Sequence, residues 1–560
     1  MICRAISSAW LLSLVHLSTF LVADDQQPRR PNVIFILTDD QGWQDAAFAG
    51  HPYVKTPHLD ALAAQSTWFR QFYVAATVCS PSRTAFMTAH YPARHLVHGH
   101  FATHQQNLAR SMPDWLAPET PTLASILKSA GYATAHIGKW HLGSGAEAPT
   151  PEAYGFDFVR HTTGNHPYWE EQNSDPYFRA RSTQLFVDEA IQFIRQNRDR
   201  PFYLNLWTLL PHALLKPTPE QLEPYTNLQP SANAGAFGPW MRKYLENAKE
   251  LTSQMQVFCA SLTDLDTQLG RLFQTLAELS LADDTIVVFS SDNGPEDYRI
   301  GNAANAGVGS TGSLRGRKRS MYEGGIRTFG LVRWPGHVPA GRRDETSVVA
   351  AVDLLPTICK LTGTVVPSSV APDGEDVSDI WMGDVRPRRK PLYWEWLFNV
   401  QGKDDGYMPS MLATRQGDWK LFVNHDGSQV QLFDVVADPG ELHDVSQQNP
   451  AVVFSLKEDV LSWVQSLPDS PARQAVLETG RPVDSRAAQT TNQSEASGSI
   501  PNSRQEIFQR KDSNQDKHLT LAEFLDRFPD QDEGRLRFSR FDVDGDNVLS
   551  LEEFVKAGKQ

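Results

Sequence analysis

Cysteine is scarce in this chain, and the basic residues do not balance the acidic ones. Four cysteines among 560 residues are too few to staple a fold of this length, so the sequence predicts a large hydrophobic core instead. The formal net charge of −14 leaves no basic surplus to neutralise phosphates, which argues against nucleic acid as a partner. Beyond the N-terminal segment no apolar run is long enough to cross a membrane. If this acidic globular protein binds an anion, its basic groups must be concentrated locally.

The N-terminus has the pattern of a secretory signal. Arg4 precedes a mostly apolar stretch over 9–22, and Ala23 is a suitable cleavage position. We therefore expect residues 1–23 to be a signal peptide. The mature protein is then expected to be exported, either to a periplasm or to the cell exterior.

Cys79 opens the most informative stretch, a Cys-Ser-Pro-Ser-Arg pentapeptide that ends at Arg83. Pro81 suits the first turn of a helix, so Cys79 is expected at the N-terminal end of a helix with Arg83 one turn further on. A helix end and a guanidinium together attract an anion. The alternative is a buried cysteine in front of an ordinary helix. Cys3 lies in the expected signal peptide, and the remaining two cysteines, Cys259 and Cys359, either form one disulfide or stay free.

Four apolar, strand-like segments each lead into polar residues that are capable of chemistry. The segments cover 32–37, 134–137, 202–207 and 285–289. Helical patterns lie between them, which predicts an α/β fold whose strands are buried on both faces of a parallel sheet. Sites in open α/β sheets form beyond the carboxyl ends of the strands. The side chains expected to converge there are Asp39, Asp40, Lys139, His141, His212, Asp292 and Asn293.

Hard oxygen donors come from four of these residues: Asp39, Asp40, Asp292 and Asn293. Carboxylates crowded together repel one another unless a cation joins them. Oxygen-only ligation favours calcium or magnesium over zinc, and an amide oxygen among several carboxylates suits calcium. Taken separately, Asp39 can cap a helix and Asp292 can begin a turn. Their shared position at strand ends favours a metal site.

Basic and imidazole side chains accompany the acidic ones. Lys139 and His141 lie two residues apart and share a face if that stretch is extended, which suits an oxygen of an anion and a proton transfer. His212 follows a proline and can donate a proton to a leaving alcohol. The densest basic segment, 309–319, contains Lys318 and supplies the local positive charge that an anion site needs. Each feature alone also has a plainer interpretation as a surface lysine, a hydrogen-bonded histidine or a solvated loop.

Taken in order along the chain, these motifs resemble those of the type I, formylglycine-dependent sulfatases of the alkaline-phosphatase-like superfamily. The resemblance runs from about residue 31 to residue 381 and includes the pentapeptide and the Gly-Lys-Trp-His, Leu-Pro-His, Asp-Asn-Gly and Glu-Gly-Gly segments. It implies an α/β catalytic domain over 31–385, with a large mixed sheet sandwiched by helices. It also implies a small antiparallel sheet subdomain over 386–470.

The resemblance further implies a role for each site residue. Cys79 would be converted to formylglycine by a formylglycine-generating enzyme, and one hydroxyl of the hydrated aldehyde would attack the sulfur of a sulfate ester. The second hydroxyl would later expel sulfate by reforming the aldehyde. The implied calcium ligands are Asp39, Asp40, modified Cys79, Asp292 and Asn293. Arg83 would fix the hydrate, and Lys139 and Lys318 would bind sulfate oxygens. His141 would orient or deprotonate the hydrate, and His212 would protonate the leaving oxygen. The substrate implied for an exported sulfatase is a sulfated carbohydrate.

The C-terminal part of the chain changes character. Residues 471–503 are expected to be a linker, because the later part is rich in serine, glutamine and asparagine. Residues 504–560 are expected to form an all-α EF-hand pair that binds additional calcium, and a solvated acidic tail is the alternative. The predicted ligands are Asp512, Asn514, Asp516, Thr520 and Glu523 in the first loop, and Asp542, Asp544, Asp546, Ser550 and Glu553 in the second. Lys517 and Asn547 stand where such loops usually have glycine, and asparagine tolerates a left-handed turn more readily than lysine does.

Two questions stay open in the sequence. The histidines at 95, 98, 100 and 104 suggest either a zinc site or, with more weight, substrate contact or an ordinary surface. The leading function, a calcium-dependent sulfatase, also has rivals. One is a phosphodiester or phosphonate hydrolase of the same superfamily, and another is a non-catalytic calcium- or carbohydrate-binding protein.

Overall fold

A computed structural model describes the protein over residues 30–483, apart from 144, 146, 163–174, 249, 297–303 and 400–406. In the C-terminal tail it describes 508, 511–512, 514, 516–525, 538–539, 541–542, 544 and 546–556. The chain divides into two compact units, residues 1–485 and 486–560. The expected signal peptide and the expected linker beyond residue 483 lie outside the described residues.

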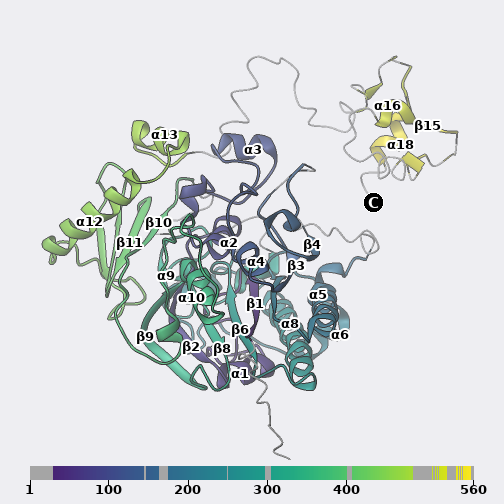
Figure 1. Ribbon diagram of the computed structural model, residues 1–560. Coiled ribbons are helices and arrows are strands. Elements are labelled where there is room, and N and C mark those ends of the chain that lie inside the picture. The colour runs from purple at the N-terminus through teal and green to yellow at the C-terminus, as the bar shows by residue number, and fades with distance from the viewer. Residues whose placement is uncertain are drawn as a thin grey trace, which may run out of the picture. The chain divides into compact units, whose positions relative to one another are not determined.

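A nine-stranded mixed sheet forms the centre of the first unit (Figure 1). Its order is β4-β3-β5-β1-β6-β8-β2-β7, with β9 paired to β2. The strands from β4 to β6 in this order are parallel, whereas β8 runs antiparallel to both of its neighbours. The strands are β1 (Asn32–Asp39), β2 (Thr67–Tyr73), β3 (Ala133–Lys139), β4 (Phe158–Thr162), β5 (Phe202–Pro211), β6 (Thr285–Ser291), β7 (Arg327–Thr328), β8 (Leu331–Arg333) and β9 (Arg342–Ala350).

Helices cover both faces of this sheet. The main ones are α1 (Pro57–Ala64), α2 (Cys79–Thr88), α3 (His104–Ala109), α4 (Leu123–Ser129), α5 (Phe178–Asn197), α6 (Pro219–Leu222), α7 (Pro239–Glu246), α8 (Leu251–Glu278), α9 (Glu323–Ile326), α10 (Leu354–Leu361) and α11 (Ser378–Trp381). Alternate residues of β1 serve the two faces. Phe35 belongs to the core cluster that includes α2, α4 and α10, and Ile36 belongs to the cluster that includes α1, α5 and α8. Burial on both sides explains why β1 is an unbroken apolar run.

A small antiparallel sheet follows, in the order β10-β11-β12-β13. Its strands are β10 (Leu392–Glu395), β11 (Leu412–Gln416), β12 (Trp419–Val423) and β13 (Gln431–Asp434), and α12 (Pro450–Gln465) packs on β11 and β12. A buried ion-pair network ties this sheet to α9. Lys420 Nζ on β12 lies 2.8 Å from Glu323 Oε1 and 3.0 Å from Glu441 Oε1. The expected large mixed sheet and small antiparallel sheet are thus confirmed.

The expected linker begins later than predicted. Its first residues form α13 (Pro471–Thr479), in which Ala472 and Val476 are buried. Ser470 caps this helix by accepting a hydrogen bond from the backbone of Arg473. The Arg473 guanidinium in turn forms an ion pair with Glu395 at 2.7 Å. These apolar and ionic contacts fix the segment to the first unit, so 471–479 is not linker.

The second unit, in its described residues, contains the short antiparallel pair β14 (His518–Thr520) and β15 (Val548–Ser550), in addition to α16 (Leu521–Leu525) and α18 (Leu551–Lys556). An all-α tail is therefore too simple a prediction. Phe508, Phe524 and Phe554 pack together with Leu519 and Leu549 from the two strands. The tail thus has a small hydrophobic core of its own.

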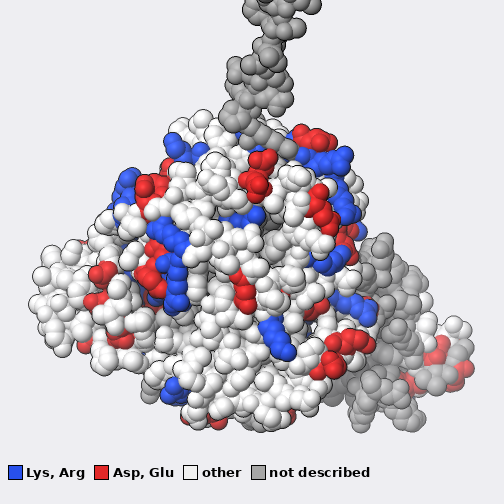
Figure 2. Space-filling model, turned by 90° about the horizontal axis from the view of Figure 1, so that it is seen from below, with Lys and Arg blue, Asp and Glu red and all other residues white. Residues whose placement is uncertain are grey.

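Charges of both signs are interspersed on the face of the molecule that Figure 2 shows. No patch of one sign stands out there among the described residues. None of the helices in the described part of the chain is both long and apolar enough to span a bilayer.

Candidate active site

Neighbouring parallel strands bring the predicted site residues to one edge of the sheet. Asp39 ends β1, which lies between β5 and β6, and Asp40 follows it in a left-handed conformation with φ of 64°. Lys139 ends β3, His212 directly follows β5, and Asp292 directly follows β6. The carboxyl ends of adjacent strands therefore meet as the strand pattern predicts.

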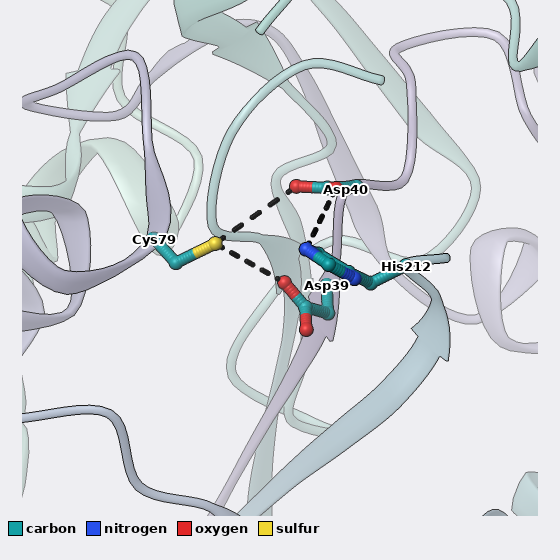
Figure 3. Close-up of side chains that lie close together, drawn as sticks. All are labelled: Asp39, Asp40, Cys79 and His212. Carbon is teal, nitrogen blue, oxygen red and sulfur yellow. Dashed lines mark hydrogen bonds and ion pairs between the residues drawn. The ribbon is translucent and has the colours of Figure 1, made fainter. Parts of the chain in front are cut away.

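Four of these side chains form a compact group, shown in Figure 3. One ligand atom from each of Asp39, Asp40, Cys79 and His212 lies within 4.8 Å of the others, and all four residues are buried. Cys79 is the first residue of α2, as expected. Its Sγ lies 3.4 Å from Asp39 Oδ1 and 4.0 Å from Asp40 Oδ1. The start of α2 thus points the position-79 side chain at the paired carboxylates.

The thiol itself is a poor nucleophile in this setting. Burial raises the pKa of the Cys79 thiol well above its usual value, and the negative charge of Asp292 raises it further. Lys139 and Lys318 oppose these effects without overcoming them. Because the thiolate is the nucleophilic form, this raised pKa disfavours a thiolate mechanism for unmodified Cys79.

Arg83 lies one turn along α2 and holds the base of the site together. Its Nε and Nη2 donate to Asp292 Oδ2 at 3.0 and 2.7 Å, and its Nη1 donates to the backbone carbonyl of Lys139 at 3.0 Å. The guanidinium is fully buried. It therefore links the ends of β3 and β6 to the helix that carries Cys79.

Two lysines neutralise the paired aspartates. Lys139 Nζ lies 2.6 Å from Asp39 Oδ2, and Lys318 Nζ lies 2.6 Å from Asp40 Oδ2. Lys318 is also 3.5 Å from Glu296 Oε2. The basic loop at 309–319 thus places one of its residues in the site, where an anion can meet two ammonium groups.

The donor set fits a hard divalent cation. Asn293 Nδ2 donates to Asp40 Oδ1 at 2.7 Å, while Asn293 Oδ1 is buried and has no hydrogen-bond partner among the described residues. Burial raises the pKa of Asp40 to about 7, and the charges of Asp39 and Glu296 add to this effect although Lys318 opposes it. An unpartnered amide oxygen beside crowded carboxylates is the arrangement that calcium or magnesium stabilises.

The environment of the Asp292 carboxylate differs from that of the other predicted ligands. Its Oδ2 accepts from Arg83, and its Oδ1 accepts from the backbone N–H of Asp40 at 3.1 Å. Burial and the charge of Asp39 raise the pKa of Asp292, which Arg83 partly offsets. Asp292 and Asn293 therefore border the compact group rather than belong to it.

Both predicted histidines are held as neutral imidazoles. Burial, followed by the charge of Lys318, lowers the pKa of His212 well below its usual value. Burial, followed by Lys139, does the same for His141. His141 has a φ of 57°, so it does not continue the extended strand, and its buried Nδ1 has no hydrogen-bond partner among the described residues. His212 Nε2 lies 3.6 Å from Asp40 Oδ2.

The structure adds residues that sequence reasoning missed. Glu296 forms an ion pair with Arg319 as well as with Lys318. Its place two residues after the Asp-Asn-Gly turn could have identified it from the sequence as a residue near the site. Arg179, near the start of α5, donates Nη2 to the backbone carbonyl of Ala213 at 2.9 Å. Nothing in the local pattern of α5 distinguishes Arg179 from a surface arginine.

The histidines at 95, 98, 100 and 104 contact separate groups. His95 contacts His90, and His98 lies near Glu395. His104 forms an ion pair with Asp114, whereas the His100 ring lies 6.3 Å from the His141 ring between centroids. Among the described residues these four histidines form no metal-binding group, so the zinc interpretation is not supported.

The two remaining cysteines do not pair. Cys259 and Cys359 are both free and buried. They belong to different core clusters on opposite faces of the main sheet. Their role is packing within each core.

Comparison with known proteins agrees with this geometry. The sulfatase family profile matches residues 31–364, and the profile described as N-sulphoglucosamine sulphohydrolase, C-terminal, matches residues 316–465. Arylsulfatase A of Homo sapiens is 30% identical over 466 residues, which cover 77% of this chain and 82% of the relative. N-acetylgalactosamine-6-sulfatase of Sus scrofa is 31% identical over 449 residues, which cover 75% of this chain and 78% of the relative.

Solved structures share the fold. The crystal structure of Ps i-CgsB in complex with k-i-k-neocarrahexaose has a TM-score of 0.63 and 26% identity, and covers 78% of this chain and 93% of its own. The phosphonate monoester hydrolase of Agrobacterium radiobacter has a TM-score of 0.58 and 21% identity, covers 79% of this chain and 97% of its own, and shares the fold alone.

The mixed sheet with its acidic and basic strand ends defines a hydrolase of the alkaline-phosphatase-like fold. The chain belongs to the sulfatase family. It is accordingly a sulfuric ester hydrolase, and the expected enzyme class is confirmed.

Proposed function

We propose that the protein is an exported, calcium-dependent sulfatase that cleaves sulfate esters of carbohydrates through a formylglycine derived from Cys79. The observation that carries the proposal is the position of Cys79, whose Sγ faces the paired carboxylates of Asp39 and Asp40. Its raised thiol pKa makes a thiolate mechanism unfavourable. A modified side chain that does not need to ionise as a thiol suits this position better.

Asp39, Asp40 and Asn293 would hold the calcium, with Asp292 at the border and the position-79 side chain completing the set. The unpartnered Asn293 Oδ1 supports this assignment. When bound, the cation would polarise a sulfate oxygen and offset the buried negative charge.

The protein's own side chains would bind and orient the ester. Lys139 and Lys318 carry the ammonium groups that would hold the sulfate oxygens and stabilise charge in the transition state. Arg83 fixes the end of α2, and so the direction of the position-79 side chain, through its bonds to Asp292. A hydrated aldehyde at position 79 would supply the attacking hydroxyl.

The two histidines would move protons. Burial lowers the pKa of His212 and keeps its ring neutral before the ester binds. His212 would therefore first take up a proton when the anionic ester binds beside it, and would then give that proton to the leaving oxygen as the sulfur–oxygen ester bond breaks. The Nδ1 atom of His141 would accept a hydrogen bond or a proton from the position-79 hydroxyl groups, since that atom is otherwise unpartnered among the described residues. The lowered pKa of His141 keeps its ring neutral and able to accept.

The names of relatives support a carbohydrate substrate. They include N-acetylgalactosamine-6-sulfatase of Canis lupus familiaris and of Sus scrofa. Export rests on the signal-like residues 1–23. Conversion of Cys79 would require a formylglycine-generating enzyme in the producing cell.

The test compares hydrolysis of 4-nitrophenyl sulfate and of bis(4-nitrophenyl) phosphate by the wild type and Cys79→Ala. We expect sulfate turnover to dominate and to be lost in Cys79→Ala, while the matched control Cys259→Ala keeps it. Mass spectrometry of the peptide that contains residue 79 should show the aldehyde. Dominant phosphodiester turnover would favour the phosphonate or phosphodiester rival, and full activity of Cys79→Ala would refute the nucleophile.

Additional calcium in the tail is a separate part of the proposal. Ligand atoms of Asp542, Asp544 and Glu553 lie within 4.8 Å of one another. Lys517 and Asn547 both have positive φ, 70° and 66°, so both loops make the turn for which glycine is usual. Asp512 Oδ1 and Oδ2 accept from the backbone of Asp516 and Lys517 in the first loop. These turns favour an EF-hand pair over a solvated acidic tail.

A further inference from the structure

Charges around the candidate active site are matched almost one to one. The carboxylate–cation pairs are Asp39 with Lys139, Asp40 with Lys318, Asp292 with Arg83, and Glu296 with Arg319. Two arginines near the site stand outside this pairing: Arg179, whose Nη2 donates to the Ala213 carbonyl beside His212, and Arg110. Arg110 is half-buried and has no carboxylate partner among the described residues. A guanidinium that is partly withdrawn from water without a counter-charge keeps donors that a bound anion can satisfy.

Arg110 is connected to the active site by short contacts. It directly follows α3, and its Nη1 donates to the backbone carbonyl of His100 at 2.9 Å. The next residue, Phe101, donates its backbone N–H to Ser80 Oγ at 3.0 Å, and its carbonyl lies 3.2 Å from His141 Nε2. The segment 100–101 therefore borders both the residue after Cys79 and His141.

The surroundings of Arg110 are positive. Burial and then the like charge of Arg319 lower the pKa of Arg110. Burial and then the charges of Arg110, Arg319 and Lys318 lower the pKa of His100 well below its usual value. The acid nearest in sequence, Asp114, is bonded to His104 Nδ1 at 2.6 Å and to Asn107 Nδ2 at 2.8 Å. Asp114 is thus engaged with other groups.

We propose that Arg110, with the His100 ring beside it, binds a second anionic group of the substrate, either a sulfate or a uronate carboxylate of the same glycan. The inference rests on the proposed function, because the scissile sulfate is taken to lie between Lys139 and Lys318. A planar guanidinium presents two parallel N–H groups that match either anion. Within the described part of the chain, only the His100 carbonyl accepts from Arg110, and the other Arg110 donors can do this. The preferred substrate therefore carries at least two negative groups.

The experiment measures inhibition of 4-nitrophenyl sulfate hydrolysis by three small sugars. N-acetylgalactosamine 6-sulfate carries one anion, the unsaturated chondroitin 6-sulfate disaccharide adds a carboxylate, and glucosamine 2-N,6-O-disulfate adds a sulfate. The readout is the ratio of inhibition constants between one-anion and two-anion sugars, so a general loss of activity cancels. We expect the wild type to prefer a two-anion sugar by about tenfold, as one charge-assisted bidentate contact allows, and Arg110→Gln to lose that preference.

Arg110→Lys keeps the charge without the planar donor pair, so it should retain part of the preference. Arg333→Gln is the matched control, because Arg333 lies at the end of β8 beside α1 and donates to Gln65. The sugar that loses preference in Arg110→Gln identifies the second anion as sulfate or carboxylate. An unchanged ratio in Arg110→Gln, or no preference in the wild type, would overturn this inference alone. Absence of all sulfate-ester hydrolysis by the wild type would overturn the proposed function and this inference with it.

Discussion

The buried network that joins the small sheet to α9 should make stability depend on pH through Glu441. Two fully buried carboxylates, Glu323 and Glu441, share the Lys420 ammonium group. Glu441 Oε2 also accepts the backbone N–H of Glu323 at 2.7 Å. Burial raises the pKa of Glu441 to about 7, with the charge of Glu323 adding to the effect and Lys420 opposing it. For Glu323, burial is outweighed by Lys420 and Arg327, and the pKa falls to about 2.

These two shifts act in separate pH windows. The raised pKa of Glu441 means that the folded protein keeps a proton that the unfolded chain releases above about pH 4.5. Stability from Glu441 is therefore fully present below about pH 4.5 and is lost as the pH rises through about 7. Stability from Glu323 is present above about pH 4.5 and is lost as the pH falls toward 2. Of these two groups only Glu441 titrates between pH 5 and 8, and across that window its shift from 4.5 to about 7 corresponds to a loss of about 2 to 3 kcal/mol.

The variant Glu441→Gln removes this titration while keeping the size of the side chain. Urea unfolding at pH 5, 6, 7 and 8 would give the difference in unfolding free energy between the wild type and the variant. We expect that difference to move by about 2 to 3 kcal/mol in favour of the variant as the pH rises. Glu458→Gln, at an exposed position of α12, is the control and should give a flat difference. A flat difference for Glu441→Gln as well would refute the reasoning.

Three further predictions concern binding and turnover. Chelation should abolish turnover of the sulfate ester, and added calcium should restore it. Asn293→Leu should raise the calcium concentration needed for restoration by at least about tenfold, because a ligand oxygen is lost. Restoration of the variant at the wild-type calcium concentration would contradict the Asn293 assignment. Arg179→Gln should lower kcat/KM for 4-nitrophenyl sulfate by about tenfold, because a cation beside the His212 segment is removed, and an unchanged value would place Arg179 outside the site. In calorimetric titration of the full chain, Asp542→Asn with Glu553→Gln should remove one calcium equivalent, and unchanged stoichiometry would argue against the second tail loop.

Local sequence patterns identified much of the site because its residues follow strand ends. Each strand is an apolar run buried on both faces, and the first polar residues after it must lie at the sheet edge. The sequence alone therefore predicts the positions of Asp39, Lys139, His212 and Asp292 at this edge. Arg179 and Arg110 escaped it, because a half-buried arginine in or after a helix has the same local pattern as a solvated one.

The sequence by itself determined the family, the strand-end chemistry and the start of α2 at Cys79, since these depend on short-range order along the chain. Tertiary structure alone decided which charges neutralise one another. The pairing of Lys318 with Asp40 joins residues 278 positions apart, and no spacing rule predicts such a contact. It also decided that the pKa of the Cys79 thiol is raised, because burial depends on every element packed around it. The guanidinium of Arg110, which has no carboxylate partner among the described residues, became visible for the same reason, since a counter-charge can come from any part of the chain.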